Sequence, residues 1–199
     1  MRVLPGHAPF LRAVLAPLLF LFFMSPVFAE EQPAVAYDTL VIVYFPSSCS
    51  AFWPALKSEL ERSETPELLT ASAVWITQDE FQKGMESKHG YEILLHGDCR
   101  MAAPGTSQNR PRGPLGWVLM INHQIQPFVH VDCDRVRQML HRELRDKTTA
   151  ERRRILARAV SRIVVHEMTH IVTQSSLHGA SGLEKAHVSS FDLLAYKPD

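Results

Sequence analysis

The C-terminal third of the chain has the pattern of one long amphipathic helix, and this pattern constrains the fold more than any other. Thr148 and Glu151 have the Thr-x-x-Glu spacing of a capping box, which marks a helix start. Apolar residues then recur at helical spacing until about Thr173, at Ile155, Leu156, Ala159, Val160, Ile163, Val164 and Met168. A helix with so continuous an apolar stripe must lie against a sheet.

Shorter patterns before this helix predict the elements that it packs against. Apolar and β-branched runs predict strands at residues 40–45, 73–76 and 91–95, and helical spacing predicts helices at residues 50–62, 78–86 and 132–144. The mixed order of strands and helices predicts the α+β class, with residues 30–199 forming a single domain.

Two apolar runs separated by a short polar stretch predict a β-hairpin. The runs are residues 117–121 and 125–131, and they flank Asn122-His123-Gln124. Pro127 lies in the second run and has no backbone N–H to donate. We therefore expect the second run to be an edge strand.

Polar stretches predict two further features. Residues 102–114, rich in Pro, Gly, Ser and Asn, predict a long surface loop, which is either a flap over a cleft or a plain insertion. Near the C-terminus, Ser189 or Ser190 is expected to cap a final short helix.

The N-terminus has the three parts of a secretory signal peptide. Arg2 and Arg12 precede an apolar run at residues 13–24, and Val27-Phe28-Ala29 has the small-residue pattern of a cleavage site. We expect residues 1–29 to be removed by cleavage after Ala29, which makes the mature protein secreted or periplasmic. The apolar run is shorter than the roughly 20 residues of a membrane-spanning helix, so no stable membrane anchor is expected after cleavage.

The charge balance limits the classes of partner to expect, and the cysteine content indicates whether a disulfide forms. Lys and Arg together number 21, and Asp and Glu together also number 21. This even charge balance gives no reason to expect a nucleic acid partner. In an oxidising compartment, two of Cys49, Cys99 and Cys133 are expected to pair. Each follows an apolar, strand-like run, and we favour a disulfide of Cys99 with either of the others. No two of these cysteines have a Cys-x-x-Cys spacing, so the sequence does not indicate cysteine ligands for zinc.

Near its C-terminal end, the predicted helix contains His166-Glu167-Met168-Thr169-His170. Histidines four residues apart project from one face of a helix, so both imidazoles can reach one Zn²⁺ at about 2.1 Å. The Glu167 carboxylate then lies beside the metal, where it serves as the general base for an attacking water. The plainer interpretation keeps both histidines as polar residues on the rim of a packed helix.

A catalytic zinc needs three protein ligands and one open position. Small residues after Gln174 end the helix and let the chain turn back, which makes His178 the preferred third ligand, with Glu184 and His187 as alternatives. A donor for the oxyanion is also needed, and Tyr196, His187 and Lys185 are candidates. Five other histidines are expected to be structural, namely His89, His96, His123, His130 and His141.

The His-Glu-x-x-His motif resembles that of the zincin metallopeptidases. The segment His178-Gly179-Ala180-Ser181-Gly182-Leu183-Glu184-Lys185-Ala186 resembles part of short, exported bacterial zincin-like proteins. The similarity continues upstream through Gly97-Asp98-Cys99, Leu115-Gly116-Trp117-Val118 and Pro127-Phe128-Val129, so it covers most of the mature chain.

This resemblance implies a zincin-like mixed sheet with an edge hairpin, packed on a long active-site helix. It implies that His166, His170 and His178 are zinc ligands and that Glu167 is the general acid/base. It also implies that an edge strand before the active helix, here residues 125–131, holds the substrate in extended form.

The sequence departs from the metzincin pattern within the zincins in two respects. Metzincins have a glycine after the second histidine and a third histidine six residues on, and here Val172, Thr173 and Ser176 stand at the neighbouring positions. Leu183-Glu184 stands where metzincins have a methionine. The implied function is an exported zinc-dependent peptidase acting on a peptide or protein substrate. The alternatives are a non-catalytic exported binding protein with a zincin fold and a zinc amidase acting on cell-wall peptide.

Overall fold

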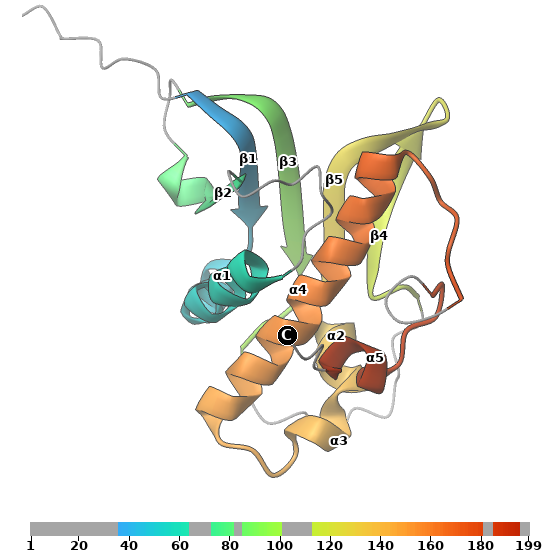
Figure 1. The fold of residues 1–199 in the computed structure, drawn as a ribbon. Helices are drawn as coiled ribbons and strands as arrows, with labels where there is room; N and C mark the ends of the chain where they lie inside the picture. Colours follow the sequence, from blue (N-terminus) through green and yellow to red (C-terminus); the bar gives the residue numbers. More distant parts are fainter. Residues whose placement is uncertain (1–35, 64–72, 82–84, 101–112, 181–184, 196–199) are drawn as a thin grey trace, which may run out of the picture. The chain divides into compact units, whose positions relative to one another are not determined.

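The computed structural model describes residues 36–63, 73–81, 85–100, 113–180 and 185–195 (Figure 1). The chain divides into two units, Met1–Gln32 and Pro33–Asp199, and every described residue belongs to the second. The predicted signal peptide, most of the predicted loop at 102–114, and the candidates Glu184 and Tyr196 lie outside the described residues. None of the described helices is long and apolar enough to span a membrane.

Five strands form one mixed sheet in the order β2-β1-β3-β5-β4. Strands β2, β1, β3 and β5 run parallel, and β4 is antiparallel to β5. Their bounds are β1 Ala36–Tyr44, β2 Ala73–Thr77, β3 Glu86–His96, β4 Gly116–Ile121 and β5 Gln124–Asp132. The predicted strands and the hairpin are present, and the mixed sheet with its helices is consistent with the α+β class.

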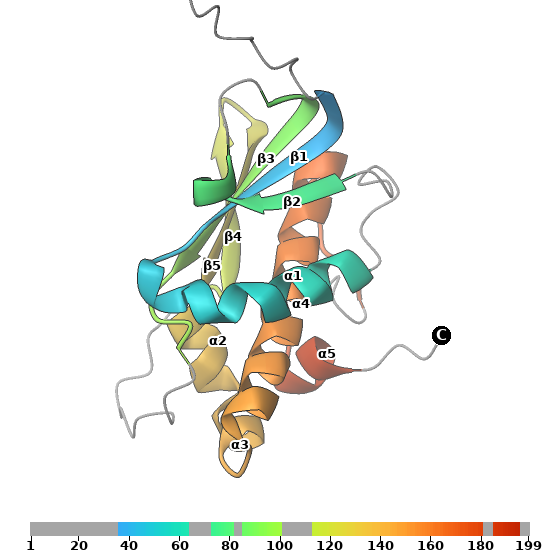
Figure 2. The same cartoon turned by 90° about the vertical axis from the view of Figure 1, so that its left-hand side faces the viewer.

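The long helix α4 packs against β4 and β5, and α1 packs against α4 (Figures 1 and 2). The α-helices are α1 Trp53–Arg62, α2 Cys133–Met139, α3 His141–Leu144, α4 Thr149–Thr173 and α5 Ser190–Leu194, and the short 3-10 helices are η1 Ser47–Phe52 and η2 Gln78–Glu80. Both predicted caps are confirmed: Thr148 and Glu151 form a reciprocal capping box, as do Ser189 and Asp192.

The core lies between one face of the sheet and the apolar stripe of α4. Alternate residues of a strand point to opposite faces of the sheet, so every second side chain is buried under the helix. The buried sheet residues include Val41, Val43, Ile93, Leu95, Val129 and Val131, and the buried α4 residues include Leu156, Val160, Val164 and Met168. This layer fixes the position of α4 over the β4–β5 hairpin.

The helix predicted at residues 78–86 is wrong. Residues 78–80 form only one 3-10 turn, and Glu86 is already the first residue of β3. Strand β3 extends back this far because Glu86 pairs with Ala36 of β1. A pairing with a strand so distant in sequence overrides the weak local spacing.

The helix predicted at residues 132–144 is two helices that meet at Leu140. The backbone of Leu140 (φ −85°, ψ 9°) leaves the helical region and separates α2 from α3. Val136, Leu140 and Leu144 are nonetheless all buried. The spacing therefore identified the apolar face correctly but did not reveal the break.

The prediction that the strand with Pro127 is an edge strand is also wrong. Strand β5 lies between β3 and β4, and the edge strand is β4. Pro127 is tolerated inside the sheet because the ladder with β3 begins only at Phe128, while the register with β4 shifts between Val118 and Met120. Residues 125–131 are therefore not the edge strand that the resemblance implied, and the strand at this edge of the described sheet is β4.

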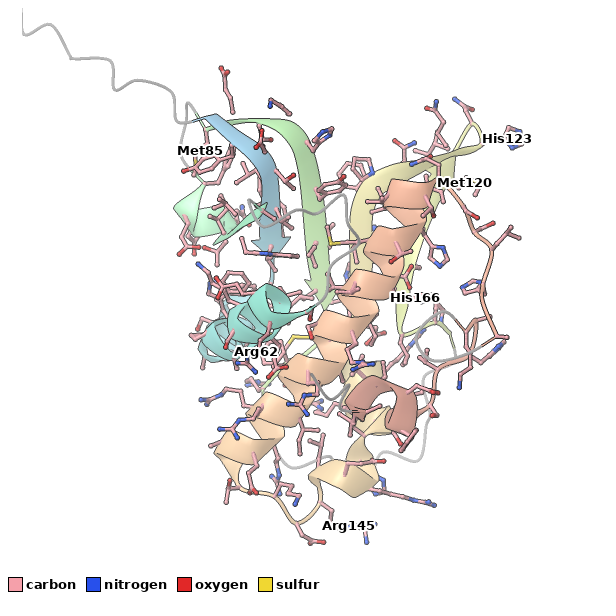
Figure 3. All side chains as sticks on the ribbon, viewed as in Figure 1. Arg62, Met85, Met120, His123, Arg145 and His166 are labelled. Carbon is pink, nitrogen blue, oxygen red and sulfur yellow. A yellow bond between two sulfur atoms is a disulfide. The ribbon has the colours of Figure 1, made fainter. Side chains whose placement is uncertain are left out.

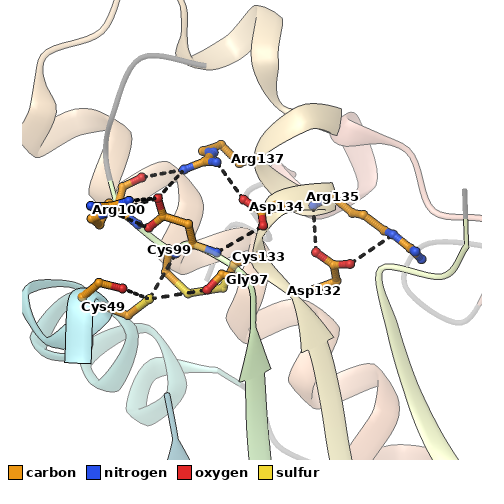
Figure 4. Close-up of a disulfide and its surroundings, with 11 residues drawn as sticks. Cys49, Gly97, Cys99, Arg100, Asp132, Cys133, Asp134, Arg135 and Arg137 are labelled. Atoms are coloured by element: carbon orange, nitrogen blue, oxygen red, sulfur yellow. Dashed lines mark hydrogen bonds and ion pairs between the residues drawn. A yellow bond between two sulfur atoms is a disulfide. The ribbon is translucent and has the colours of Figure 1, made fainter. Parts of the chain in front are cut away.

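A disulfide joins the chain after β3 to the start of α2 (Figure 4). It pairs Cys99 with Cys133, which is one of the two pairings favoured from the sequence. Cys49 remains a buried thiol, and its Sγ accepts a hydrogen bond from the Cys99 N–H at 3.1 Å. The same corner is tied by the Arg137 guanidinium, which binds the carboxylate of Asp134 at 2.7 Å.

Candidate metal centre

The last two turns of α4 present two histidines on one face. His166 and His170 are separated by one turn of the helix, and their Nε2 atoms lie 3.2 Å apart. His170 is buried and His166 is half-buried. His166 projects from α4 on the side where β4 and the segment returning from the helix lie (Figure 3).

The third histidine comes from the segment that follows α4. The helix ends at Thr173, and residues 175–180 turn back along it. The ring of His178 lies 5.3 Å from that of His166 and 4.8 Å from that of His170, measured between centroids. One ligand nitrogen from each histidine lies within 4.8 Å of the others, so the three residues predicted as ligands are brought together.

The donor set fits zinc. Bonds of about 2.1 Å in tetrahedral geometry separate ligand nitrogens by about 3.4 Å. The 3.2 Å between the Nε2 atoms of His166 and His170 is close to that separation. His178 is exposed on the return segment, and its ligand nitrogen lies within 4.8 Å of the other two.

A backbone carbonyl fixes the protonation pattern of His170. The Ser175 oxygen lies 2.6 Å from Nδ1 of His170 and has no proton of its own, so Nδ1–H is the donor. A neutral imidazole protonated at Nδ1 leaves the Nε2 lone pair directed at the cluster. Metal-binding histidines ordinarily have such a partner on the second ring nitrogen.

The carboxylate of Glu167 is buried against β4. Glu167 as a whole is only 7% exposed, and this burial raises the pKa of its carboxyl group to about 7. A Cβ added at Gly116 of β4 would lie 3.0 Å from the Glu167 Oε1 and would clash with Cγ2 of Ile163. Glu167 therefore lies in a narrow, largely dry space that exists because residue 116 has no side chain.

An open pocket of about 400 Å³ borders the three histidines. Its other lining residues are Val165, Thr169, Thr173, Ser175, Leu177 and Gly179. Leu177 is 85% exposed, although it is a large apolar residue. The pocket gives a ligand direct access to the imidazole cluster from solvent.

The other candidates from the sequence do not join this cluster in the described part of the chain. His187 is exposed and is not among the three converging histidines, and Lys185 donates to the Asp192 carboxylate at 2.8 Å. His96 and His130 lie on the opposite face of the sheet with Trp117. His141 lies 3.3 Å from the guanidinium of Arg145.

Two contributors to the site, Gly116 and Ser175, were not identified from the sequence. Gly116 directly precedes the strand predicted at residues 117–121 and is the first residue of β4. A glycine in a strand indicates close approach of another group, and Gly116 has that meaning here. No sequence pattern indicates that the Ser175 carbonyl would meet an imidazole. Comparison with known proteins adds nothing further: no family, no curated protein and no solved structure matches the chain.

Proposed function

We propose that this chain is an exported zinc-dependent peptidase in which His166, His170 and His178 bind the ion and Glu167 is the general base. The main support is the convergence of three imidazoles beside an open pocket, with the buried Glu167 following His166 directly on α4. Structural zinc sites use four protein ligands and are closed, whereas catalytic sites keep one position open. The described residues offer three ligands and an open side.

The chemistry requires a metal and a base in fixed positions. Zinc at this site would lower the pKa of a water molecule and polarise the substrate carbonyl. Glu167, held against Gly116, takes the proton of the attacking water and returns it to the leaving amine. The rigid helix and the narrow space beside β4 keep its carboxylate in place during both transfers.

Strand β4 suggests why the substrate is an extended peptide. In the described part of the sheet, β4 pairs with β5 on one side and leaves its other edge open. An extended chain can add to such an edge through main-chain hydrogen bonds. Because Gly116 of β4 contacts Glu167, a peptide bound at this edge would lie beside the general base.

Export is proposed from the N-terminal sequence. We expect the protein produced in bacteria to be recovered outside the cytoplasm with Glu30 as its first residue. Intact-mass measurement of the purified protein tests this directly. Recovery of the full-length chain in the cytoplasm would contradict the proposal.

The first experiment on the activity measures zinc and cleavage together. We expect the purified protein to contain about one equivalent of zinc. It should cleave members of a mixed peptide library, lose this activity with a chelator and regain it when zinc is added. Less than about half an equivalent of tightly bound zinc at neutral pH would contradict the proposed site.

The variant Glu167→Gln separates catalysis from metal binding. It keeps the size of the side chain but removes the base, so kcat should fall by at least about 100-fold while zinc content stays the same. Glu61→Gln is the matched control, because Glu61 is exposed on α1. Unchanged cleavage by Glu167→Gln would overturn the mechanism, and a zinc-loaded wild type without cleavage would indicate a binding protein.

A further inference from the structure

The end of α4 has an unusual residue at its turn. Gln174 has a left-handed backbone (φ 49°, ψ 33°), and the N–H groups of Gln174 and Ser175 donate to the carbonyls of Ile171 and His170, respectively. This is the hydrogen-bond pattern of a Schellman motif, in which the left-handed position is usually glycine because a Cβ is unfavourable there. A glutamine at this position needs another source of stabilisation.

The side chain of Gln174 supplies it through three hydrogen bonds. Its Oε1 accepts from the Ile125 N–H at 3.0 Å, and its Nε2 donates to the carbonyls of Ile125 at 3.0 Å and Ile171 at 2.7 Å. The amide thus binds both main-chain groups of Ile125, as a neighbouring strand would. The ladder between β5 and β3 begins only at Phe128, so the Gln174 amide occupies the place of a strand partner.

The residue after Gln174 controls a proposed metal ligand. Ser175 binds His170 twice: its N–H donates to the His170 carbonyl at 3.3 Å, and its own carbonyl accepts from Nδ1 of the His170 ring at 2.6 Å. The direction of the Ser175 carbonyl follows from the backbone turn at Gln174. A continuous set of contacts therefore runs from Ile125 in β5 through Gln174 and Ser175 to the His170 imidazole.

We propose that Gln174 is a positioning residue for the metal centre. Its amide holds the left-handed turn in the one arrangement that directs the Ser175 carbonyl at Nδ1 of His170, and this keeps Nε2 directed at the metal. The same amide fixes the β4–β5 hairpin to the end of α4. The inference rests on the proposed zinc site and concerns metal binding, so it does not depend on the substrate.

Gln174→Gly is the decisive variant, because glycine adopts the left-handed turn without strain. A purely structural role for Gln174 predicts that this variant is at most less stable than the wild type and binds zinc equally tightly. A positioning role predicts that the dissociation constant for zinc rises about tenfold, the effect typical of losing an outer-shell contact to a metal ligand. Competition with a chromophoric chelator measures that constant on the purified protein.

Ser176→Gly is the matched control. It removes a small polar side chain and adds glycine two residues further along the same segment, with the Gln174 contacts left intact. We expect its zinc affinity to equal that of the wild type. Thermal unfolding of both variants without metal tests whether each has kept the fold.

A second readout follows the His170 ring itself. The Nδ1–H proton of His170 should give a slowly exchanging NMR signal in the wild type, and this signal should weaken in Gln174→Gly. A variant that is simply less stable would lose many amide signals together instead.

Each outcome separates the inference from the proposed function. Equal zinc affinity in Gln174→Gly and wild type would overturn the inference, as would an equal loss in Gln174→Gly and Ser176→Gly, which would reflect general loosening of the segment. A wild type that binds no zinc would overturn both proposals. Tight zinc binding with the expected tenfold loss, but without any peptide cleavage, would support the positioning role and refute the peptidase.

Discussion

Two groups of histidines lie on opposite faces of the sheet, and they differ in what their ring nitrogens face. In the sheet group, the rings of His96, His130 and Trp117 are stacked, with centroids 5.0 to 5.3 Å apart. In the helix group, the rings of His166 and His170 are nearly perpendicular, with an angle of 89° between their planes.

The number of converging ring nitrogens distinguishes the group that could hold a metal ion. In the sheet group, His96 Nε2 and His130 Nδ1 lie 2.9 Å apart and form a hydrogen bond, and no third metal-ligating side chain joins them in the described residues. His130 Nε2 is buried without a hydrogen-bond partner in the described residues. In the helix group, the Ser175 carbonyl binds the outer nitrogen of His170, while one nitrogen from each of His166, His170 and His178 lies within 4.8 Å of the others. Proximity of two imidazoles is therefore not sufficient, because a third ligand must also converge on the same point.

The largest predicted effect is a loss of zinc affinity caused by a change in the helix group alone. His178→Ala removes one of the three proposed ligands, and we expect the affinity for zinc to fall by more than about 100-fold, beyond the loss typical of an outer contact. His130→Phe removes an imidazole from the sheet group and should leave the zinc affinity unchanged.

Zinc titration of both variants tests this contrast, and His187→Ala adds a useful control because His187 was the rival third ligand. If His178→Ala retained full affinity while His187→Ala lost it, the proposed ligand set would be wrong.

A second prediction uses two neighbouring residues of β4 that face the two groups. Gly116→Ala places a methyl group against Ile163 and the Glu167 carboxylate. We expect a loss of about 1–3 kcal/mol in the free energy of unfolding, as is usual for overpacking. If Glu167 is the general base as proposed, its displacement should also lower kcat by about tenfold or more.

Trp117→Leu is the companion variant on the opposite face. It loses ring stacking with both histidines and should cost about 1 kcal/mol of unfolding free energy, with zinc affinity and kcat unchanged. Denaturant unfolding and peptide cleavage measure the two properties separately. A Gly116→Ala protein with wild-type kcat would contradict the placement of Glu167.

The smallest predicted effect is a pH dependence of the sheet group. Burial, together with the charge of His96, lowers the pKa of His130. The unfolded chain therefore binds a proton first as pH falls through about 6.5, and the free energy of unfolding decreases in that range. The stability contributed by neutral His130 is present above this pH.

Urea unfolding of the metal-free protein at pH 8 and pH 5.5 measures this dependence. His130→Phe should show a smaller decrease between the two pH values than the wild type does, because the remaining histidines titrate in both proteins. An equal decrease would mean that His130 is not the group responsible.

Features with a strong local pattern were predicted well. The capping box of Thr148 and Glu151 marked the start of α4, and the apolar stripe gave its length. The Asn122-His123 stretch marked the hairpin, where both residues adopt positive φ angles of 50° and 63°. These features depend on interactions within a few residues, which a single sequence records directly.

Features that depend on distant partners were predicted poorly. The residues before β3 show helical spacing, but pairing with β1 makes them a strand from Glu86 onward. Pro127 suggested an edge strand because proline has no N–H to donate to a ladder. It is tolerated in an inner strand because the ladder with β3 begins after it and the register with β4 shifts. Both outcomes are set by the arrangement of the whole sheet.

The candidate site shows the same division. His166 and His170 could be grouped from the helical repeat alone, and the structure brings them together with His178. The spacing does not reveal the close approach of Glu167 to Gly116 or the amide contacts of Gln174 with Ile125. These contacts join segments about 50 residues apart in the chain, so only the folded arrangement displays them.

The irregular register of the β4–β5 hairpin has a consequence for the behaviour of the protein in solution. An open edge strand is a template on which identical molecules can aggregate, and Leu119, Met120 and Ile121 leave this one apolar and exposed. The irregularity between Val118 and Met120 bends and twists the strand pair. A bent edge can pair with a short extended segment but disfavours the long in-register pairing that an array of identical molecules needs, so we expect the distortion that accommodates Pro127 also to disfavour polymerisation through β4.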